Sequence, residues 1–198
     1  MSLSRIVIAT TNSDKLREIE QILTDLPLEL VPLSAYPGVS PAPEDQETFE
    51  ANARQKALHY AAATGEVVVA EDSGFEIDRL DRAPGVRSAR HPGRDYAERM
   101  ATLYAELEAR GPRESRARFV CAVALASSGA VLFETRCTVE GAVAPEPRGT
   151  GGFGYDPMFL YPPYGRTLAE VSQDEKAAVS HRGQAFRQLR AWLARATL

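Results

Sequence analysis

The three lysines of the chain are the first residues whose type and position suggest chemistry. The 23 lysine and arginine residues comprise 20 arginines and only three lysines, Lys15, Lys56 and Lys176. An ammonium is a compact charge with three rotatable donors, whereas a guanidinium is a broad planar fork, so the two are not interchangeable. A chain that prefers arginine is expected to keep lysine where a compact charge is needed. For any single lysine, a chance surface position is the alternative.

The first lysine closes a polar segment that lies between a predicted strand and a predicted helix. Its members are Thr10, Thr11, Asn12, Ser13, Asp14 and Lys15. Hydroxyl, amide and ammonium groups at a helix N-terminus favour a polyphosphate, because the free N–H groups there attract anions. A plain helix cap with a solvated lysine would use the same residues. The segment is not a P-loop, because GxxxxGK[ST] is absent.

Acidic residues mark two further places in the sequence. Glu44 lies in a loop just before a helix that carries Asn52 and Lys56 on one face, four residues apart. Glu71 and Asp72 follow an apolar strand, and neighbours in a strand face opposite ways, so one of them is expected to point into a site and to hold Mg²⁺ or orient water. The alternative for Glu44 is an acid that is stabilised only by the helix dipole. The alternative for residues 71–74, EDSG, is a plain turn at the end of the strand.

A glycine-dense loop, GTGGFGYD over residues 149–156, brings backbone close to a ligand while Phe153 or Tyr155 stacks on a base. Ser180, His181 and Arg182 open the last predicted helix, where side-chain donors and free N–H groups coincide. A flexible hairpin tip and a surface His-Arg pair are the structural alternatives.

These segments are positioned by alternating strands and helices. Strands are predicted over residues 5–10, 28–31, 66–70, 118–126 and 130–139. Helices are predicted over residues 15–26, 47–63, 95–110, 174–178 and 183–196. The last two strands form an antiparallel hairpin across Ser127, Ser128 and Gly129, and residues 32–43, 79–94 and 161–165 are read as loops or turns. The pattern predicts an α/β protein with a mixed sheet.

Composition excludes several other classes. A chain of 198 residues with 44% hydrophobic and 25% charged residues suits one globular domain. The net charge of −4 argues against an extended nucleic-acid surface. No apolar run is long enough for a membrane span or a signal segment, so a cytoplasmic location is expected. Cys121 and Cys137 lack CxxC spacing and are expected to be buried thiols, and the three histidines lack the spacing of a zinc pair.

Taken together, the segments resemble the inosine triphosphate pyrophosphatase family, also called XTP/dITP diphosphatases. The matching pieces are ATTNSDKLREI, TFEANARQKA, AEDSGFEID with APGVRSAR, and GTGGFGYDPMF followed by EKAAVSHRGQA. They occur in the family's order and cover residues 5 to about 192, and the pair GTGGFGYDP and SHRGQA is the most specific part. Thr11 replaces a usual glycine and Phe75 a usual leucine, and neither change removes a polar group that the chemistry needs.

The resemblance implies an elongated mixed β-sheet with flanking helices, in two lobes around a central cleft, as one domain over residues 1–198. It also implies a homodimer. The triphosphate would be bound by Thr10 to Lys15 and by Lys56. Glu44 and Asp72 would hold Mg²⁺, and Asp72 would be the catalytic base. The remaining substrate-binding residues would be Ser73, Phe153, Gly154, Tyr155, Asp156, Lys176, His181 and Arg182.

The expected reaction is hydrolysis of ITP, dITP and XTP to the monophosphate and pyrophosphate. Hypoxanthine and xanthine carry a 6-oxo acceptor where adenine carries an amino donor, so donors from His181 or Arg182 would pair with the oxo group and be left unpaired by adenine. The substrate is then a small nucleoside triphosphate, with no nucleic acid and no membrane as partner. A Maf-like pyrophosphatase acting on other modified nucleotides and a nucleotide-binding module without turnover are the alternatives.

Overall fold

A computed structural model describes residues 3–196 of the chain, which divide into two compact units. Unit 1 comprises the residues up to Asp72, Cys121–Cys137, and the residues from His181 onward. Unit 2 comprises Ser73–Val120 and Thr138–Ser180. Each unit has its own hydrophobic core, and the divisions fall within the predicted EDSG and SHR motifs.

The strands form a mixed sheet in the order β2-β1-β3-β4-β5-β6-β7. Their bounds are β1 Arg5–Ile8, β2 Glu29–Pro32, β3 Val68–Ile77, β4 Arg116–Ser127, β5 Ala130–Val143, β6 Phe159–Tyr161 and β7 Arg166–Thr167. β1 pairs in parallel with β2 and β3, with Val7 opposite Val31 and Val68, whereas β6 is antiparallel to β5 and β7. The short turn between β4 and β5 makes these neighbours an antiparallel hairpin, as predicted.

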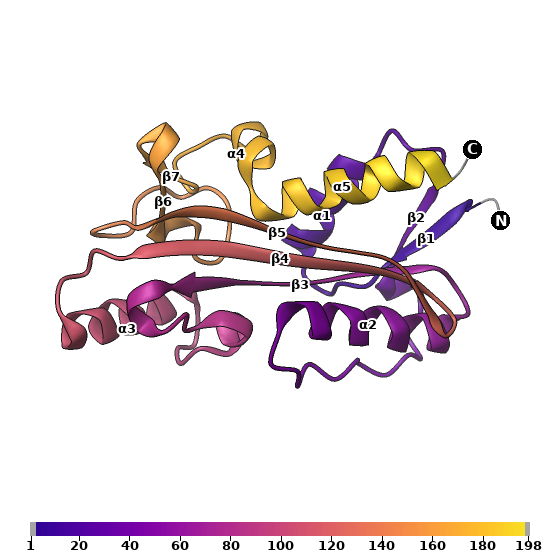
Figure 1. Ribbon diagram of the computed structural model, residues 1–198, viewed down its shortest axis with the longest axis horizontal. Coiled ribbons are helices and arrows are strands. Elements are labelled where there is room, and N and C mark those ends of the chain that lie inside the picture. Colours follow the sequence, from indigo (N-terminus) through magenta and orange to yellow (C-terminus); the bar gives the residue numbers. More distant parts are fainter. Residues whose placement is uncertain (1–2, 197–198) are drawn as a thin grey trace. The chain divides into compact units, whose positions relative to one another are not determined.

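Helices flank the strands of unit 1. They are α1 Ser13–Leu23, α2 Phe49–Thr64 and α5 His181–Ala196. α1 and α5 lie on one face of the strands and α2 on the other (Figure 1). Ile19 of α1 and Phe186 of α5 are buried with Ile6 and Val69 of the strands, so the apolar stripes of the two helices share one core. α2 ends at Gly65, which takes the left-handed conformation that glycine adopts without strain.

Unit 2 carries the helices α3 Tyr96–Arg110 and α4 Gln173–Val179. α3 buries Leu103 and Leu107 against Phe75 of β3 and Phe119 of β4. Asp95, predicted as the first residue of this helix, is its N-cap and accepts from the Glu98 N–H. The α/β class with a mixed sheet and flanking helices is therefore confirmed, and the cleft between two lobes stays a prediction.

The strand that carries EDSG differs most from its prediction. The sequence predicted that this strand ends at Ala70, but β3 continues through Glu71, Asp72, Ser73 and Gly74 to Ile77. Charged residues normally end a buried strand, because an unpaired buried charge is costly. Here both acids are paired with cations, so the strand passes through them. The reading of EDSG as a turn at the end of a strand is wrong.

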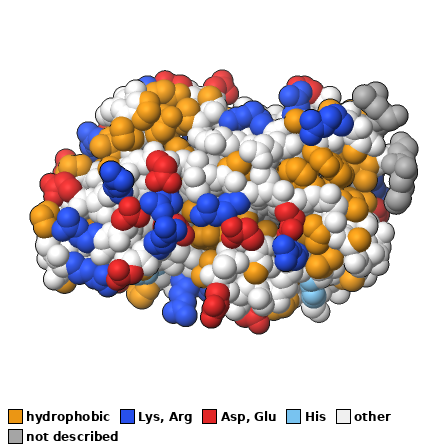
Figure 2. Space-filling view, in the orientation of Figure 1, with side chains coloured by type: hydrophobic (Ala, Val, Ile, Leu, Met, Phe, Trp, Pro, Cys, Tyr) orange, Lys and Arg blue, Asp and Glu red, His pale blue; other side chains and the backbone are white. Residues whose placement is uncertain are grey.

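Smaller differences follow from short elements that carry little periodicity. β4 and β5 are longer than predicted, β6 and β7 were not predicted, and 3₁₀ helices occupy parts of the predicted loops. Cys121 and Cys137 are free and buried, as predicted. Among residues 3–196, no helix is long and apolar enough to cross a membrane. On the face drawn in Figure 2, basic and acidic side chains are interspersed.

Close packing of β5 against β6 predicts that Gly141→Ala destabilises the protein. A Cβ at this position would overlap the Leu160 carbonyl oxygen and the Phe159 ring, both part of the neighbouring strand. We expect a loss of ~1–3 kcal/mol in the free energy of unfolding, the usual cost of overpacking. Urea denaturation followed by circular dichroism measures it. Gly38→Ala is the control, because a Cβ at Gly38 would meet no atom within 4 Å. Equal stability of the two variants would contradict the packing described.

Candidate active site

Two adjacent carboxylates inside β3, Glu71 and Asp72, are held by different partners within unit 1. Successive side chains of a strand point to opposite faces, so the two acids meet different helices. Glu71 is paired with Lys15 and Arg182, and Asp72 with Lys56. Both acids are buried, and β3 therefore presents one carboxyl group to each side of the sheet.

Glu71 is enclosed by donors. Lys15 Nζ lies 2.5 Å from its Oε1, and Arg182 lies 3.4 Å from its Oε2. The Cys121 thiol donates to the same Oε2 at 3.2 Å. Burial pushes the pKa of Glu71 upward, but Arg182 and Lys15 outweigh burial and hold the pKa well below its ordinary value. The lowered pKa favours the ionised form of Glu71, which pairs with the Lys15 ammonium.

Arg182 joins Glu71 to α1. Its guanidinium lies 2.7 Å from Glu18 Oε2, and its side chain is only 2% exposed. Burial alone would lower the pKa of Arg182, but Glu71 and Glu18 raise it, so the cation is retained. Glu18, Arg182, Glu71 and Lys15 form a row of alternating charges that ties the first turns of α1 and α5 to β3. The predicted contact between Arg182 and the purine base stays a prediction.

Lys56 lies between the two predicted metal ligands. Its Nζ is 2.8 Å from Glu44 Oε1 and 3.4 Å from Asp72 Oδ1. Burial raises the pKa of Asp72, and Lys56 and Asn52 act in the opposite direction without cancelling the rise. Among residues 3–196, no three His, Cys, Asp or Glu side chains form a metal cluster on their own. Two carboxylates that face one cation nevertheless fit a divalent metal, because oxygen ligands shared with substrate phosphates are what Mg²⁺ prefers.

The turn before α1 combines both readings of its sequence. Asn12 is the N-cap, and its Oδ1 accepts from the N–H groups of Asp14 and Lys15 at 2.9 and 3.0 Å. The Thr10 hydroxyl accepts from the Asn12 N–H. Thr11 and Ser13 are exposed. The cap is therefore real, but the reading of Lys15 as a solvated surface lysine is wrong, because Lys15 is held by Glu71.

A second cluster lies in unit 2, around Lys176. Its Nζ is 2.6 Å from Asp156 Oδ2, both side chains are 3% exposed, and the ammonium lies 4.4 Å from the centre of the Phe153 ring. Asp156 Oδ2 also accepts from the Phe153 N–H at 2.8 Å. A Cβ at Gly152 would overlap this carboxylate, so the loop needs glycine there. Asp156 thus closes the loop and holds the ammonium under an aromatic ring.

The two aromatic candidates of the glycine loop differ in exposure. Tyr155 is 3% exposed, stacks on Phe75 and donates to the Ser88 carbonyl oxygen. Its ring belongs to the core of unit 2. Phe153 is half-buried, so its ring is the better placed of the two for stacking on a base.

The predicted residues are therefore divided between the units. Those in unit 1 are Thr10, Thr11, Asn12, Ser13, Asp14, Lys15, Glu44, Lys56, Asp72, His181 and Arg182. Those in unit 2 are Ser73, Phe153, Gly154, Tyr155, Asp156 and Lys176. Sequence reasoning missed Glu18. A signal was available, because an acid three residues after Lys15 lies on the same helix face as the lysine.

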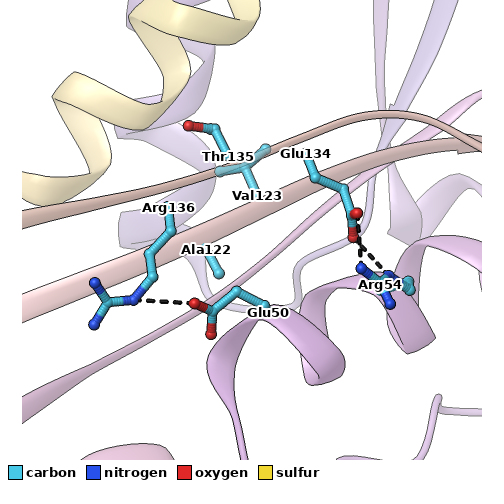
Figure 3. A pocket seen from close by; sticks show the side chains of 7 residues that line it. All are labelled: Glu50, Arg54, Ala122, Val123, Glu134, Thr135 and Arg136. Carbon is cyan, nitrogen blue, oxygen red and sulfur yellow. Dashed lines mark hydrogen bonds and ion pairs between the residues drawn. The ribbon is translucent and has the colours of Figure 1, made fainter.

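A pocket of about 200 Å³ in unit 1 holds none of the predicted residues. α2 and β5 line it with two ion pairs, Arg54 with Glu134 and Arg136 with Glu50 (Figure 3). Each charge that the pocket presents is thus already matched by its partner.

Comparison with known proteins gives consistent matches over more than nine-tenths of the chain. The model of the Ham1 family matches residues 6–192. A dITP/XTP pyrophosphatase of Exiguobacterium is 44% identical, over 94% of this chain and 95% of its own length. One of Geobacter sulfurreducens is 43% identical, over 95% and 96%. The structure of a HAM1 protein from Coxiella burnetii superposes with a TM-score of 0.89 at 41% identity, covering 98% of this chain and all of that one.

The buried row of charges predicts that Arg182→Ala is strongly destabilising. The change leaves Glu18 and Glu71 buried without the cation between them, and breaking such a pair costs ~3–5 kcal/mol in the free energy of unfolding. Arg182→Lys should recover part of the loss, because one ammonium replaces a fork that reaches two carboxylates. Chemical denaturation at neutral pH measures both.

The matched control is Arg190→Ala in the same helix. The side chains of Arg190 and its partner Asp25 are 43% and 74% exposed, and exposed pairs contribute ~1 kcal/mol or less. If Arg182→Ala unfolds at the same denaturant concentration as Arg190→Ala, the contacts of Arg182 with Glu18 and Glu71 do not stabilise the packing of α1 and α5 on β3.

Proposed function

The chain belongs to the Ham1 family, and we propose that it hydrolyses triphosphates of non-standard purines, ITP, dITP and XTP, to the monophosphate and pyrophosphate. The observation that carries the proposal is identity above 40% with relatives named dITP/XTP pyrophosphatase, over more than nine-tenths of both chains. The pairing of Glu44, Lys56 and Asp72 in unit 1 supplies the groups that such a reaction needs.

In the proposed reaction, Lys15 and Lys56 bind the triphosphate. Each ammonium is already directed by a carboxylate and has further N–H donors for phosphate oxygens. Lys15 lies at the N-terminus of α1, where the helix dipole also attracts negative charge. Thr10 to Asp14 contribute hydroxyl and backbone donors from the same turn. Charge neutralisation is most of what phosphoryl-group chemistry requires of a protein.

Asp72 is the proposed catalytic base. It orients a water molecule toward the α-phosphorus and accepts its proton, and pyrophosphate leaves as one unit, so no covalent intermediate is needed. The raised pKa of Asp72, caused by burial, makes it a better proton acceptor than an exposed carboxylate.

Glu44 and Asp72 are the residues that would hold Mg²⁺, which when bound would neutralise phosphate charge and polarise the reacting phosphorus. The Lys56 ammonium lies against these two carboxylates. Its charge lowers the pKa of Asp72 and so opposes the larger, upward effect of burial.

The base is the proposed ligand of the Lys176 cluster. Lys176 offers a donor for a 6-oxo group, and Phe153 offers a ring for stacking. Ser73, Gly154, Tyr155 and Asp156 are proposed as substrate residues from the family resemblance. His181 and Arg182 are proposed as further substrate residues from the family resemblance. A single domain over residues 1–198 and a homodimer are proposed on the same ground, and a cytoplasmic location is proposed from the composition of the chain.

The direct test is pyrophosphate release from a panel of ITP, dITP, XTP, GTP, ATP and dUTP with Mg²⁺. We expect kcat/KM for the first three to exceed that for ATP by ~10²-fold or more, because a site of buried donors leaves those donors unpaired with adenine. Equal rates on ATP, a preference for dUTP, or no turnover of any member would reject the proposal.

Asp72→Asn tests the base. The change keeps the shape of the side chain and removes its charge, and we expect kcat for ITP to fall by ~10²-fold or more with the fold retained. Circular dichroism checks the fold, and stopped assays at saturating ITP give kcat. The control is Asp45→Asn, an exposed acid in the loop that also carries Glu44. Near-normal turnover of Asp72→Asn would shift the assignment to another residue.

A further inference from the structure

Asn52 is a buried polar side chain that hydrogen-bonds to Asp72 and to the backbone of the loop that carries Glu44. It lies in the first turns of α2 and is 1% exposed. Its Nδ2 donates to Asp72 Oδ2 at 2.9 Å, and its Oδ1 accepts from the Gln46 N–H at 3.0 Å. Gln46 is two residues after Glu44 in the same loop. One amide therefore joins β3 to the loop that carries Glu44.

The chemistry of the contacts fixes how the amide is turned. The Gln46 N–H can only donate, so the atom that faces it must be the amide oxygen. The amide nitrogen then faces the carboxylate of Asp72, and it also lies 3.4 Å from the Gln46 carbonyl oxygen. The position uses a donor and an acceptor on one short planar group. Asp would supply no donor here, and Leu would supply neither.

The amide also decides which oxygen of Asp72 is left for other partners. The terminal torsion of an aspartate is broad, so its two oxygens are not fixed by the backbone. Asn52 holds Oδ2, and Lys56 lies 3.4 Å from Oδ1. Asn52 and Lys56 are four residues apart on α2 and so project from one helix face. The helix thus assigns one partner to each oxygen of the carboxylate.

We propose that Asn52 is the positioning residue of the Glu44–Asp72 pair, a role that rests on the proposed function. It turns Oδ1 of Asp72 toward Glu44 and Lys56 and anchors the loop that brings Glu44 to the same place. It acts through Asp72 and through the loop that carries Glu44. Residues that orient metal ligands in this way typically contribute ~10–100-fold to metal affinity or activity.

The test compares Asn52→Leu with Gln55→Leu. Gln55 lies on the same helix and donates to Asp45 of the same loop at 3.2 Å, so it tests loop anchoring without Asp72. The first readout is the binding of Mn²⁺ alone, followed by electron paramagnetic resonance. We expect Asn52→Leu to weaken Mn²⁺ binding by ~10-fold or more, and Gln55→Leu to bind as the wild type does. Asn52→Ser, whose hydroxyl is too short to bridge Gln46 and Asp72, should show the same loss if Asn52→Leu does not fold.

The second readout separates positioning from a general loss of structure. At saturating metal we expect Asn52→Leu to lower kcat for ITP by ~10-fold or more with KM within ~3-fold, because phosphate binding by the lysines is retained. In an Asp72→Asn background, Asn52→Leu should change Mn²⁺ affinity and kcat by a smaller factor than in the wild type, since residues that act through one another are not additive.

The failures are distinguishable. No pyrophosphate release by the wild type rejects the proposed function, whatever the variants do. No Mn²⁺ binding by the wild type, unchanged Mn²⁺ binding by Asn52→Leu, an equal loss in Gln55→Leu, or additive losses in the double variant each overturn the role of Asn52.

Discussion

Two neighbouring carboxylates buried in the middle of β3 need compensating charge, and much of unit 1 is arranged around that need. Removing an ionised carboxylate from water costs several kcal/mol unless a cation and hydrogen bonds replace the solvent. Lys15 and Arg182 do this for Glu71, and Lys56 and Asn52 for Asp72. These partners come from α1, α5 and α2. Two residues of one strand thereby fix the first turns of three helices, and the same contacts place the groups proposed for catalysis.

The charged side chains around Glu71 and Asp72 carry more negative than positive charge. Glu18, Glu44, Glu71 and Asp72 contact three cationic side chains, those of Lys15, Lys56 and Arg182, which leaves one negative charge in excess. A divalent ion held by Glu44 and Asp72, as proposed, would change this excess from one negative charge to one positive charge, which favours the approach of a triphosphate. Stability and the proposed substrate binding would then depend on the same side chains.

The preference for arginine has a structural meaning in this chain. All three lysines are paired with carboxylates, and their side chains are 21%, 10% and 3% exposed for Lys15, Lys56 and Lys176. Many arginines, such as Arg94 and Arg190, form exposed pairs instead. Arg182 is buried instead, and two nitrogens of its planar guanidinium contact Glu18 and Glu71. The ammonium groups are used where a compact charge pairs with buried or half-buried carboxylates, and the proposed function gives their remaining N–H donors to phosphate or base.

The sequence by itself determined the α/β class, the helices, the hairpin and the family, because apolar periodicity, capping residues and motif order are local properties of the chain. It also predicted from residue type that the lysines are not ordinary surface charges. Only the tertiary structure decided that β3 continues through EDSG, that Arg182 lies in the core between two acids, and that Asn52 bridges Gln46 and Asp72. Each depends on partners far apart in the sequence. Whether a buried charge is tolerated is decided by the atoms beside it in space, and the order of residues along a strand does not record them.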